Sequence, residues 1–454
     1  MSARIPRPLA ALSLVFACFA PVPTALAGPA VTVYTQDLGY VRESRTFDLA
    51  GARDTVRLEG VSERLDFSSV RLAPADASAR VLRLAYRYDV ASGDGLIEKA
   101  RGQRVSVTSR DSRVTEGTLI AADGSWLAMR SDDGSVTAVS RGAVETLRLA
   151  APPASLATRP TIEAVFEGGK CGRNEAELSY LTGGLSWSAE HTLVRRGEGA
   201  GSWATNVTVD NSTGRDYLDA TVKLVAGTPR RAGGMPPPIA AQMAMKTLAV
   251  SADGGAEMTE QAFADYHLYT LARPATLRDR ETQAIVMHEA RAVKFAPRYF
   301  YRGGDSRGVT TQIVIRNDGA SGLGVALPAG RVRFYEPDAS GALQFTGETT
   351  IGHTAEGEKL TLDVGQAFDL VAERRDLSNK RISDHEREYS VEIKLRNRKK
   401  TSVEIVVEEN IGGDIEVVAK THDFTRKDAN TLQWTILVAA GKEVVMSYTA
   451  RVRY

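Results

Sequence analysis

The sequence predicts an all-β protein composed of several antiparallel β-sandwich or immunoglobulin-like units and one small SH3-like barrel. Apolar and polar side chains alternate with a period of two along much of the chain, as in the C-terminal runs 389–396 and 444–452. Successive side chains on a strand point to opposite faces, so each run has one apolar face for a core. Gly, Asn and Lys turn segments separate the runs, and no sustained 3.6-residue apolar stripe interrupts them. Short strands at this spacing are typical of sandwiches.

The composition is that of a globular protein. Of 454 residues, 43% are hydrophobic and 25% are charged, which excludes a disordered chain. Lys plus Arg number 57 and Asp plus Glu number 56, so the formal net charge is +1. The chain lacks the basic excess that drives nucleic-acid binding, and we expect no nucleic-acid partner. Two cysteines exclude a disulfide scaffold.

Residues 1–27 are predicted to be a secretory signal peptide. Arg4 and Arg7 precede an apolar run at 9–20. This run is too short for a bilayer, which needs about 20 residues. Ala25-Leu26-Ala27 then supplies the small residues of a cleavage site, so cleavage is expected after Ala27.

The expected destination is the periplasm or the exterior. Lipidation through Cys18 is a less favoured alternative, because Phe16 is bulky for such a motif and the apolar run continues through Cys18. No later stretch has 18 consecutive apolar residues, so after signal cleavage we do not expect an integral membrane protein.

The remaining chain is expected to comprise four β units and linkers. Hairpin turns at Asp123-Gly124 and Asp133-Gly134 connect short strands in the barrel region, and Pro, Ala and Ser dominate the linker. The expected divisions are an N-terminal β unit at 28–80, the SH3-like barrel at 81–150, the linker at 151–160, a β domain at 161–300 and a C-terminal sandwich at 301–454.

Residues 228–261 are predicted to be a mobile loop within the 161–300 domain, because they are rich in Gly and Pro and lack alternation. The loop contains Met235, Met243, Met245 and Met258. Thioether sulfurs suit Cu(I), but a loop that docks on a partner or frays is the favoured interpretation. We therefore expect no cofactor.

The motifs of the common enzyme classes are absent from the sequence. None of the six histidines has HxH or HExxH spacing, and GxSxG, SxxK, GxGxxG and GxxxxGK[ST] patterns do not occur in an appropriate context. His191 continues the apolar face of residues 185–193, which indicates a core histidine. The sequence thus indicates no catalytic, cofactor-binding or metal-binding residue.

Three neighbouring segments carry a family resemblance: 179–189 (SYLTGGLSWSA), 209–214 (VDNSTG) and 218–227 (LDATVKLVAG). Together with segments near 31–41 and 427–448, they resemble the bacterial family of domain of unknown function 4139, which includes the mucoidy inhibitor A proteins. The resemblance implies a β-structured protein without established activity. Family members often have a coiled coil where this chain has the predicted small barrel, and His191 replaces a more usual aromatic residue. We expect structural roles for the motif residues Tyr180, Gly183, Gly184, Trp187 and Trp434.

Cys171 is the one cysteine that remains after cleavage at Ala27. Gly168-Gly169-Lys170 precede it and Gly172-Arg173 follow it, which predicts a partly exposed turn. An unreactive turn thiol is the favoured interpretation. A reactive thiol, for redox chemistry or an intermolecular bridge, is the alternative because neighbouring cations favour the thiolate.

The sequence favours an exported cell-envelope protein that acts as a non-catalytic binding or scaffold module for an envelope protein or a glycan. The alternative is an envelope hydrolase for glycan or peptide, with carboxylates brought together by the fold. A cleft with two acidic groups, one with a strongly raised pKa, would favour the hydrolase. An exposed apolar patch without such a pair would favour the binding module.

Overall fold

The computed structural model describes residues 28–89, 93–151, 156–227, 229, 249–250, 258–263, 266–305 and 308–454. The predicted signal peptide with Cys18, part of the 151–160 linker and most of the 228–261 loop lie outside these residues. The all-β prediction is confirmed: within the described ranges, the helical elements are α1 (Gly93–Lys99) and two short 3₁₀ turns, η1 (Arg141–Ala143) and η2 (Gly319–Ser321). None of the described helices has the length and apolar character needed to cross a membrane.

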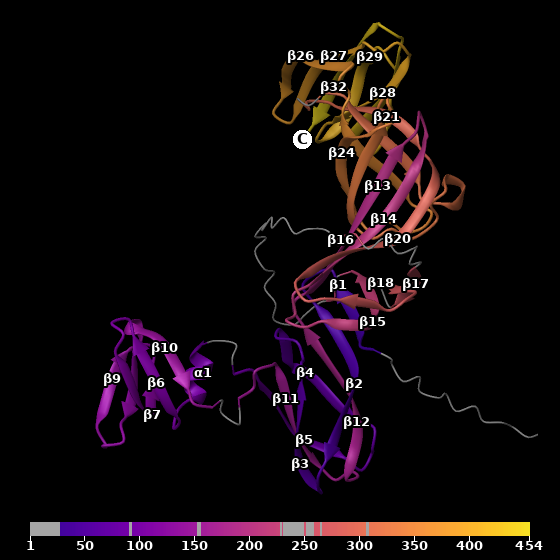
Figure 1. Cartoon of the computed structure of the whole chain (residues 1–454). Coiled ribbons are helices and arrows are strands. Elements are labelled where there is room, and N and C mark those ends of the chain that lie inside the picture. Colours follow the sequence, from indigo (N-terminus) through magenta and orange to yellow (C-terminus); the bar gives the residue numbers. More distant parts are fainter. Residues whose placement is uncertain are drawn as a thin grey trace, which may run out of the picture.

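Sheets 1 and 2 form the body that contains the N-terminal strands (Figure 1). Phe47 and Phe166 stack between them with ring centroids 4.7 Å apart. Sheet 1 has the order β17-β18-β15-β1-β2-β12-β4, with β19 paired to β15. Its strands are β1 (Ala30–Tyr34), β2 (Gly39–Leu49), β4 (Leu65–Pro74), β12 (Gly172–Thr182), β15 (Tyr217–Ala226), β17 (Met258–Phe263), β18 (Tyr266–Leu271) and β19 (Ala275–Leu277). Sheet 2 has the order β3-β11-β5, from β3 (Arg53–Glu59), β5 (Arg80–Arg87) and β11 (Thr161–Glu167).

These two sheets combine strands from both sides of the 93–149 region. β11 pairs with β3 and β5, and β12 pairs with β2 and β4, so the chain returns to sheets that it began before residue 90. β1 and β15 pair in parallel, which differs from the expected antiparallel arrangement. Alternation specifies the buried face of each strand but not its neighbour, so pairing over this sequence distance depends on tertiary packing. Residues 258–261, expected to be in the mobile loop, belong to β17.

Sheet 3 is the small unit at one side of the molecule (Figure 1). Its order is β10-β6-β7-β8-β9, and Leu119, Leu127 and Met129 belong to its core. The described β9 and β10 do not pair with each other, so the expected barrel is an open five-stranded sheet. The side chains of β9 are exposed or half-buried, and pairing this edge with β10 would bury little apolar surface. The strands are β6 (Arg104–Ser109), β7 (Val114–Ala122), β8 (Trp126–Arg130), β9 (Val136–Ser140) and β10 (Val144–Leu149).

Sheets 4, 5 and 6 form the C-terminal body (Figure 1). Sheet 4 has the order β16-β20-β14-β13-β23-β24, from β13 (Leu185–Arg195), β14 (Ala200–Asn211), β16 (Ala249–Val250), β20 (Glu281–Lys294), β23 (Gly330–Pro337) and β24 (Leu343–Ile351). Sheet 5 has the order β25-β22-β21-β28-β31-β30, from β21 (Ala296–Arg302), β22 (Thr310–Arg316), β25 (Lys359–Gln366), β28 (Val403–Asn410), β30 (Thr425–Arg426) and β31 (Thr431–Val438). Sheet 6 has the order β26-β27-β32-β29, from β26 (Leu370–Ser383), β27 (Glu386–Asn397), β29 (Asp414–Lys420) and β32 (Glu443–Arg453).

Sheet 5 contributes to two separate hydrophobic cores. Ile313 and Leu362, at its β22–β25 end, pack in a core with Phe334 of sheet 4. At its β28–β31 end, Val407 packs in a core with Ile393 of sheet 6. These strands alternate in burial, so their other face remains available for polar side chains.

Candidate functional site

Tyr180 and Trp187, the two aromatic residues of the predicted motif, are both buried. The Trp187 indole Nε1 donates a 3.1 Å hydrogen bond to the Val225 carbonyl, and its ring meets Tyr269 edge-on. The Tyr180 hydroxyl accepts a 3.2 Å hydrogen bond from Arg215 Nη1. Their contacts are with the protein interior, and neither aromatic ring is available to a ligand in solution.

Gly183 and Gly184 form the turn between β12 and β13. Gly184 has a φ of 84°, and a Cβ there would lie 2.8 Å from the Ser212 carbonyl oxygen. The Gly184 amide donates a 2.7 Å hydrogen bond to Asp37. At Gly183, a Cβ would lie 3.3 Å from Arg64 Nε. The turn therefore requires small residues because other parts of the chain approach it closely.

Trp434 is buried in the core shared by sheets 5 and 6. Its ring stacks on Tyr448 with ring centroids 5.2 Å apart, and the centroid of the Phe424 ring lies 5.7 Å from that of Trp434.

Cys171, in contrast, is exposed and unbridged. The adjacent Gly172 has a φ of 94°, which places the thiol in a turn. The fold thus separates the two tryptophans from Cys171 and does not assemble these residues into one site.

His191 is fully buried, and both of its ring nitrogens have partners. Nδ1 lies 2.9 Å from Thr205 Oγ1, and Nε2 lies 3.0 Å from the Pro328 carbonyl oxygen. Burial lowers the pKa of His191 to about 4. Within the described ranges, no group of three or more His, Cys, Asp or Glu side chains is arranged to hold a metal ion.

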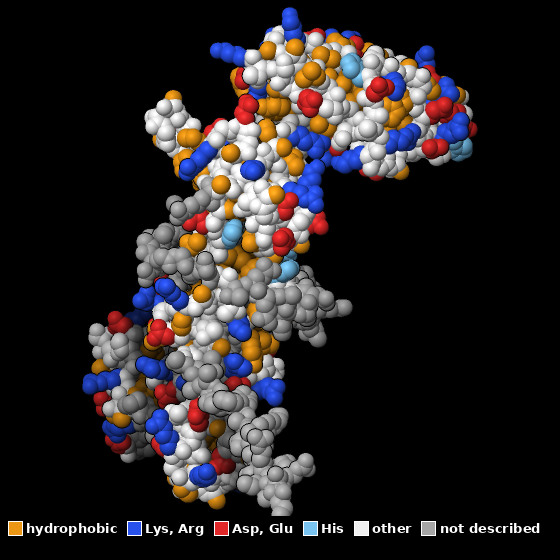
Figure 2. Space-filling view, turned by 90° about the vertical axis from the view of Figure 1, so that its right-hand side faces the viewer, with side chains coloured by type: hydrophobic (Ala, Val, Ile, Leu, Met, Phe, Trp, Pro, Cys, Tyr) orange, Lys and Arg blue, Asp and Glu red, His pale blue; other side chains and the backbone are white. Residues whose placement is uncertain are grey.

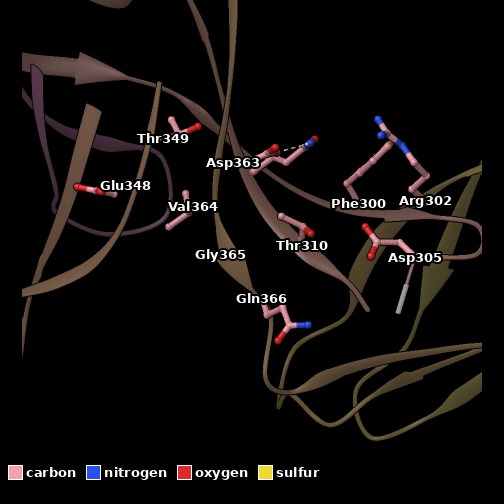
Figure 3. A pocket seen from close by; sticks show the side chains of 11 residues that line it. Phe300, Arg302, Asp305, Thr310, Glu348, Thr349, Asp363, Val364, Gly365 and Gln366 are labelled. Atoms are coloured by element: carbon pink, nitrogen blue, oxygen red, sulfur yellow. Dashed lines mark hydrogen bonds between the residues drawn. The ribbon is translucent and has the colours of Figure 1, made fainter. Parts of the chain in front are cut away.

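A polar cleft of about 280 Å³ lies where β25, an edge strand of sheet 5, meets β24, an edge strand of sheet 4 (Figure 3). Side chains from four strands and one turn converge on it. The lining residues are Phe300, Arg302, Asp305, Thr310, Gln312, Glu348, Thr349, Asp363, Val364, Gly365 and Gln366.

Strand register arranges much of this lining in rows across sheet 5. Arg298 on β21 pairs with Gln312 on β22, which pairs with Asp363 on β25. Paired residues point to the same face of a sheet, and the residues two positions along a strand share that face. The next row consists of Phe300, Thr310 and Gln366.

Gln312 is the most buried polar side chain of the cleft, with 7% of its surface exposed. Its Nε2 donates a 2.7 Å hydrogen bond to Asp363 Oδ1, which Figure 3 marks with a dashed line. Its Oε1 is buried and has no hydrogen-bond partner among the described residues. A buried acceptor without a partner costs about 1–3 kcal/mol, so a ligand that donates a hydrogen bond here would recover that cost.

Phe300 and two guanidinium groups extend the polar surface beside the cleft. The Arg298 and Arg302 guanidinium carbons lie 5.2 and 5.9 Å from the Phe300 ring centroid. Arg298 also reaches to 4.0 Å from the buried Glu408, which accepts a 2.9 Å hydrogen bond from Lys427. The cleft therefore continues into a polar strip over the outer face of sheet 5.

Of the three acidic residues of the cleft, Glu348 and Asp363 are exposed and Asp305 is half-buried. Glu348 lies 3.6 Å from Arg333 and 3.7 Å from Arg331. A carboxyl group that acts as a general acid at neutral pH usually lies in an apolar pocket that keeps it protonated. Neither Glu348 nor Asp363 has such surroundings.

Sequence reasoning did not identify the cleft residues. Gln312 lies in an ordinary alternating strand, and nothing in its local pattern distinguishes it from a surface glutamine. The β22–β25 register shifts between Thr311 and Gln312, and such a bulge has no clear signature here. Alternation in the sequence showed which face of each strand is polar. It did not show which strands lie next to one another, and therefore did not show which polar side chains meet in the cleft.

Comparisons with known proteins support the resemblance noted in the sequence. The family model described as "Domain of unknown function (DUF4139)" matches residues 176–454. This range includes Trp187, Trp434 and every strand that lines the cleft. No curated protein sequence matches the chain. The chain therefore belongs to the DUF4139 family, as the motif around Trp187 predicts.

Proposed function

We propose that this protein is an exported cell-envelope binding module that holds a polar glycan in the cleft between β24 and β25 without catalysing a reaction. The observation that carries the proposal is Gln312, whose side chain lines the open cleft while its buried Oε1 lacks a partner among the described residues. A ligand hydroxyl that donates to this oxygen when the amide turns toward the cleft would stabilise the complex.

The chemistry of the lining favours a sugar over a purely apolar or polyanionic ligand. Sugar hydroxyls donate and accept hydrogen bonds, and the cleft offers acceptors at Gln312 and Asp363 and donors at Arg302 and Thr310. The Phe300 ring lies between the Arg298 and Arg302 guanidinium groups and holds these donors beside the cleft. Figure 2 shows acidic and basic side chains interspersed over one face of the molecule. The charged residues that line the cleft are Arg302, Asp305, Glu348 and Asp363, and their acidic excess disfavours a polyanionic ligand.

Phe368 lies two residues after the cleft residue Gln366, in the turn that follows β25, and it is 97% exposed. A single exposed aromatic residue contributes little to stability. We infer that its ring packs on a bound ligand that extends beyond the cleft.

Binding should be measured by calorimetry with soluble fragments of envelope glycan. We expect Gln312→Ala and Phe368→Ala each to weaken binding by about tenfold, equivalent to one lost contact of about 1.4 kcal/mol. Gln344→Ala is the matched control, because Gln344 bonds to Asp338 and does not line the cleft. Unchanged affinity in both cleft variants would contradict the proposal.

The runner-up is a hydrolase that uses the carboxylates of the same cleft. The observation in its favour is that Asp305, Glu348 and Asp363 all line one cavity. Incubation with the same glycan fragments distinguishes the two functions, because a hydrolase would produce new reducing ends over time. Product formation that is lost in Asp363→Asn would support the hydrolase and overturn the non-catalytic role.

The export part of the proposal rests on the charged, apolar and small-residue order of residues 1–27. Fractionation of cells that produce the tagged full chain should place it outside the cytoplasm, with Gly28 as its new N-terminus. An uncleaved chain in the cytoplasm would contradict this part of the proposal. Acylated Cys18 at the N-terminus would instead support the lipoprotein route.

A further inference from the structure

A second cavity, of about 80 Å³, lies between sheet 4, sheet 1 and the segment 325–328. Its lining includes Met258 from β17, Met287 and His288 from β20, and Thr205 from β14. Two thioethers and an imidazole therefore border one small space. A water molecule occupies about 30 Å³ in the liquid, so a single metal ion fits within the cavity.

A β-bulge explains how two consecutive residues of β20 line the same cavity. Thr205 pairs with His288 and Asn206 pairs with Val286, so Met287 is the extra residue between these pairs. In a regular strand, residues 287 and 288 would point to opposite faces. Bulges are common beside functional sites because they redirect a side chain in this way.

The two histidines near this cavity differ in their hydrogen bonds. His191 uses both ring nitrogens, with Thr205 and the Pro328 carbonyl as partners. His288 Nε2 is buried and has no hydrogen-bond partner among the described residues. Of the two histidines, His288 is therefore the one with a ring nitrogen, Nε2, that is left to coordinate a ligand in the cavity.

We propose that Met258, Met287 and His288 form a binding site for Cu(I). Thioether sulfur and imidazole nitrogen are donors that suit this soft ion, whereas Mg²⁺ and Ca²⁺ require oxygen ligands. These three donors carry no charge. Placing a divalent ion among them would leave two uncompensated charges in a partly apolar cavity, which disfavours Zn²⁺ relative to a monovalent ion.

Cu(I) binding should be measured anaerobically by competition with a coloured chelator. The full chain is used with Cys18 and Cys171 replaced by Ser, because thiolates also bind Cu(I). We expect one equivalent to bind, and Met258→Leu, Met287→Leu and His288→Gln each to weaken binding by about tenfold or more. Leu has nearly the volume of Met, so the first two variants remove sulfur with little change in packing.

Two controls separate this site from other copper ligands in the chain. His422→Ala removes a half-buried histidine of the C-terminal body, which does not line this cavity, and should leave affinity unchanged. Replacement of Met235, Met243 and Met245 by Leu should also leave it unchanged. Loss of binding in this triple variant, with wild-type affinity in Met287→Leu, would overturn the assignment.

A second measurement does not depend on the chelator. Cu(I) should raise the melting temperature of the cysteine-free protein, since a ligand that binds the folded state stabilises it. The same shift should be absent in His288→Gln, with the unliganded melting temperature showing whether this variant is folded. A folded parent protein that binds no Cu(I) would also overturn the proposal.

Discussion

Arg374 on β26 and Glu409 on β28 form an ion pair between sheets 6 and 5, with Arg374 Nε 3.0 Å from Glu409 Oε1. The Tyr448 hydroxyl donates a 2.8 Å hydrogen bond to Glu409 Oε2. Burial, together with the neighbouring Glu409 carboxylate, raises the pKa of Tyr448, so the phenol stays protonated as the donor. Gly303 permits this arrangement, because a Cβ at that position would collide with the Glu409 carboxylate.

Removal of Arg374 should destabilise the C-terminal body. Arg374→Met leaves the buried Glu409 without its cation, and we expect the free energy of unfolding to fall by about 3 kcal/mol in urea denaturation. In the double variant Arg374→Met/Glu409→Leu the uncompensated charge is gone, so the loss should be smaller than in the single variant. Arg381→Met, at an exposed pair with Asp384, is the control and should change stability by less than about 0.5 kcal/mol. A double variant that is less stable than Arg374→Met would contradict this interpretation.

Stability should decrease as the pH falls from about 6.5 to about 4. The pKa of His191 is about 4 in the folded protein because of burial, against an ordinary value of 6.5. The unfolded chain therefore binds a proton in this range before the folded protein does, which favours unfolding. The difference between these two pKa values corresponds to a loss of about 3 kcal/mol in the free energy of unfolding at the acid end of this range.

Urea denaturation at a series of pH values tests the effect of His191. His191→Gln removes the titrating group, so its stability should vary less between pH 6.5 and 4, whatever its stability at pH 7. His385→Gln, at an exposed histidine, is the matched control and should retain the wild-type slope. An equal pH dependence in wild type and His191→Gln would show that other groups cause the effect.

Trp187→Ala should lower the free energy of unfolding by about 3–5 kcal/mol, because it leaves a cavity in the core and removes the hydrogen bond to Val225. Trp126→Ala provides the comparison, since Trp126 is 52% exposed on β8. We expect Trp126→Ala to change the free energy of unfolding only slightly. Thermal unfolding followed by circular dichroism measures both. Equal effects of the two substitutions would mean that the burial of Trp187 does not determine its contribution.

Cys171 should titrate as a single accessible thiol in the folded protein after cleavage at Ala27. Its exposed position between Lys170 and Gly172 gives a thiol reagent direct access. On a non-reducing gel the protein should run as a monomer. A dimer band that disappears with reductant and is absent in Cys171→Ser would instead identify an intermolecular bridge and support the reactive-thiol alternative.

Several features were predictable because they depend on local pattern. Alternation at 389–396 and 444–452 predicted strands that lie within β27 and β32, and the position of His191 on an apolar face indicated its burial. Gly184 was named from the family motif, and the structure places it in the turn between β12 and β13 with a φ of 84°. The prediction of a small barrel was wrong in one respect, because β9 and β10 do not pair and the sheet stays open. Local turn signals do not specify whether a sheet closes.

The sequence by itself determined that the chain is all-β, that it belongs to its family and which face of most strands is apolar. Only the tertiary structure decided that β24 and β25 meet at the edges of two sheets, that Gln312 lies beside Asp363, and that Met258 approaches Met287 and His288. The physical reason is that side-chain periodicity specifies the faces of a strand. Its partners, register and bulges depend on how all the sheets pack together, so residues far apart in the chain become neighbours without any local signal.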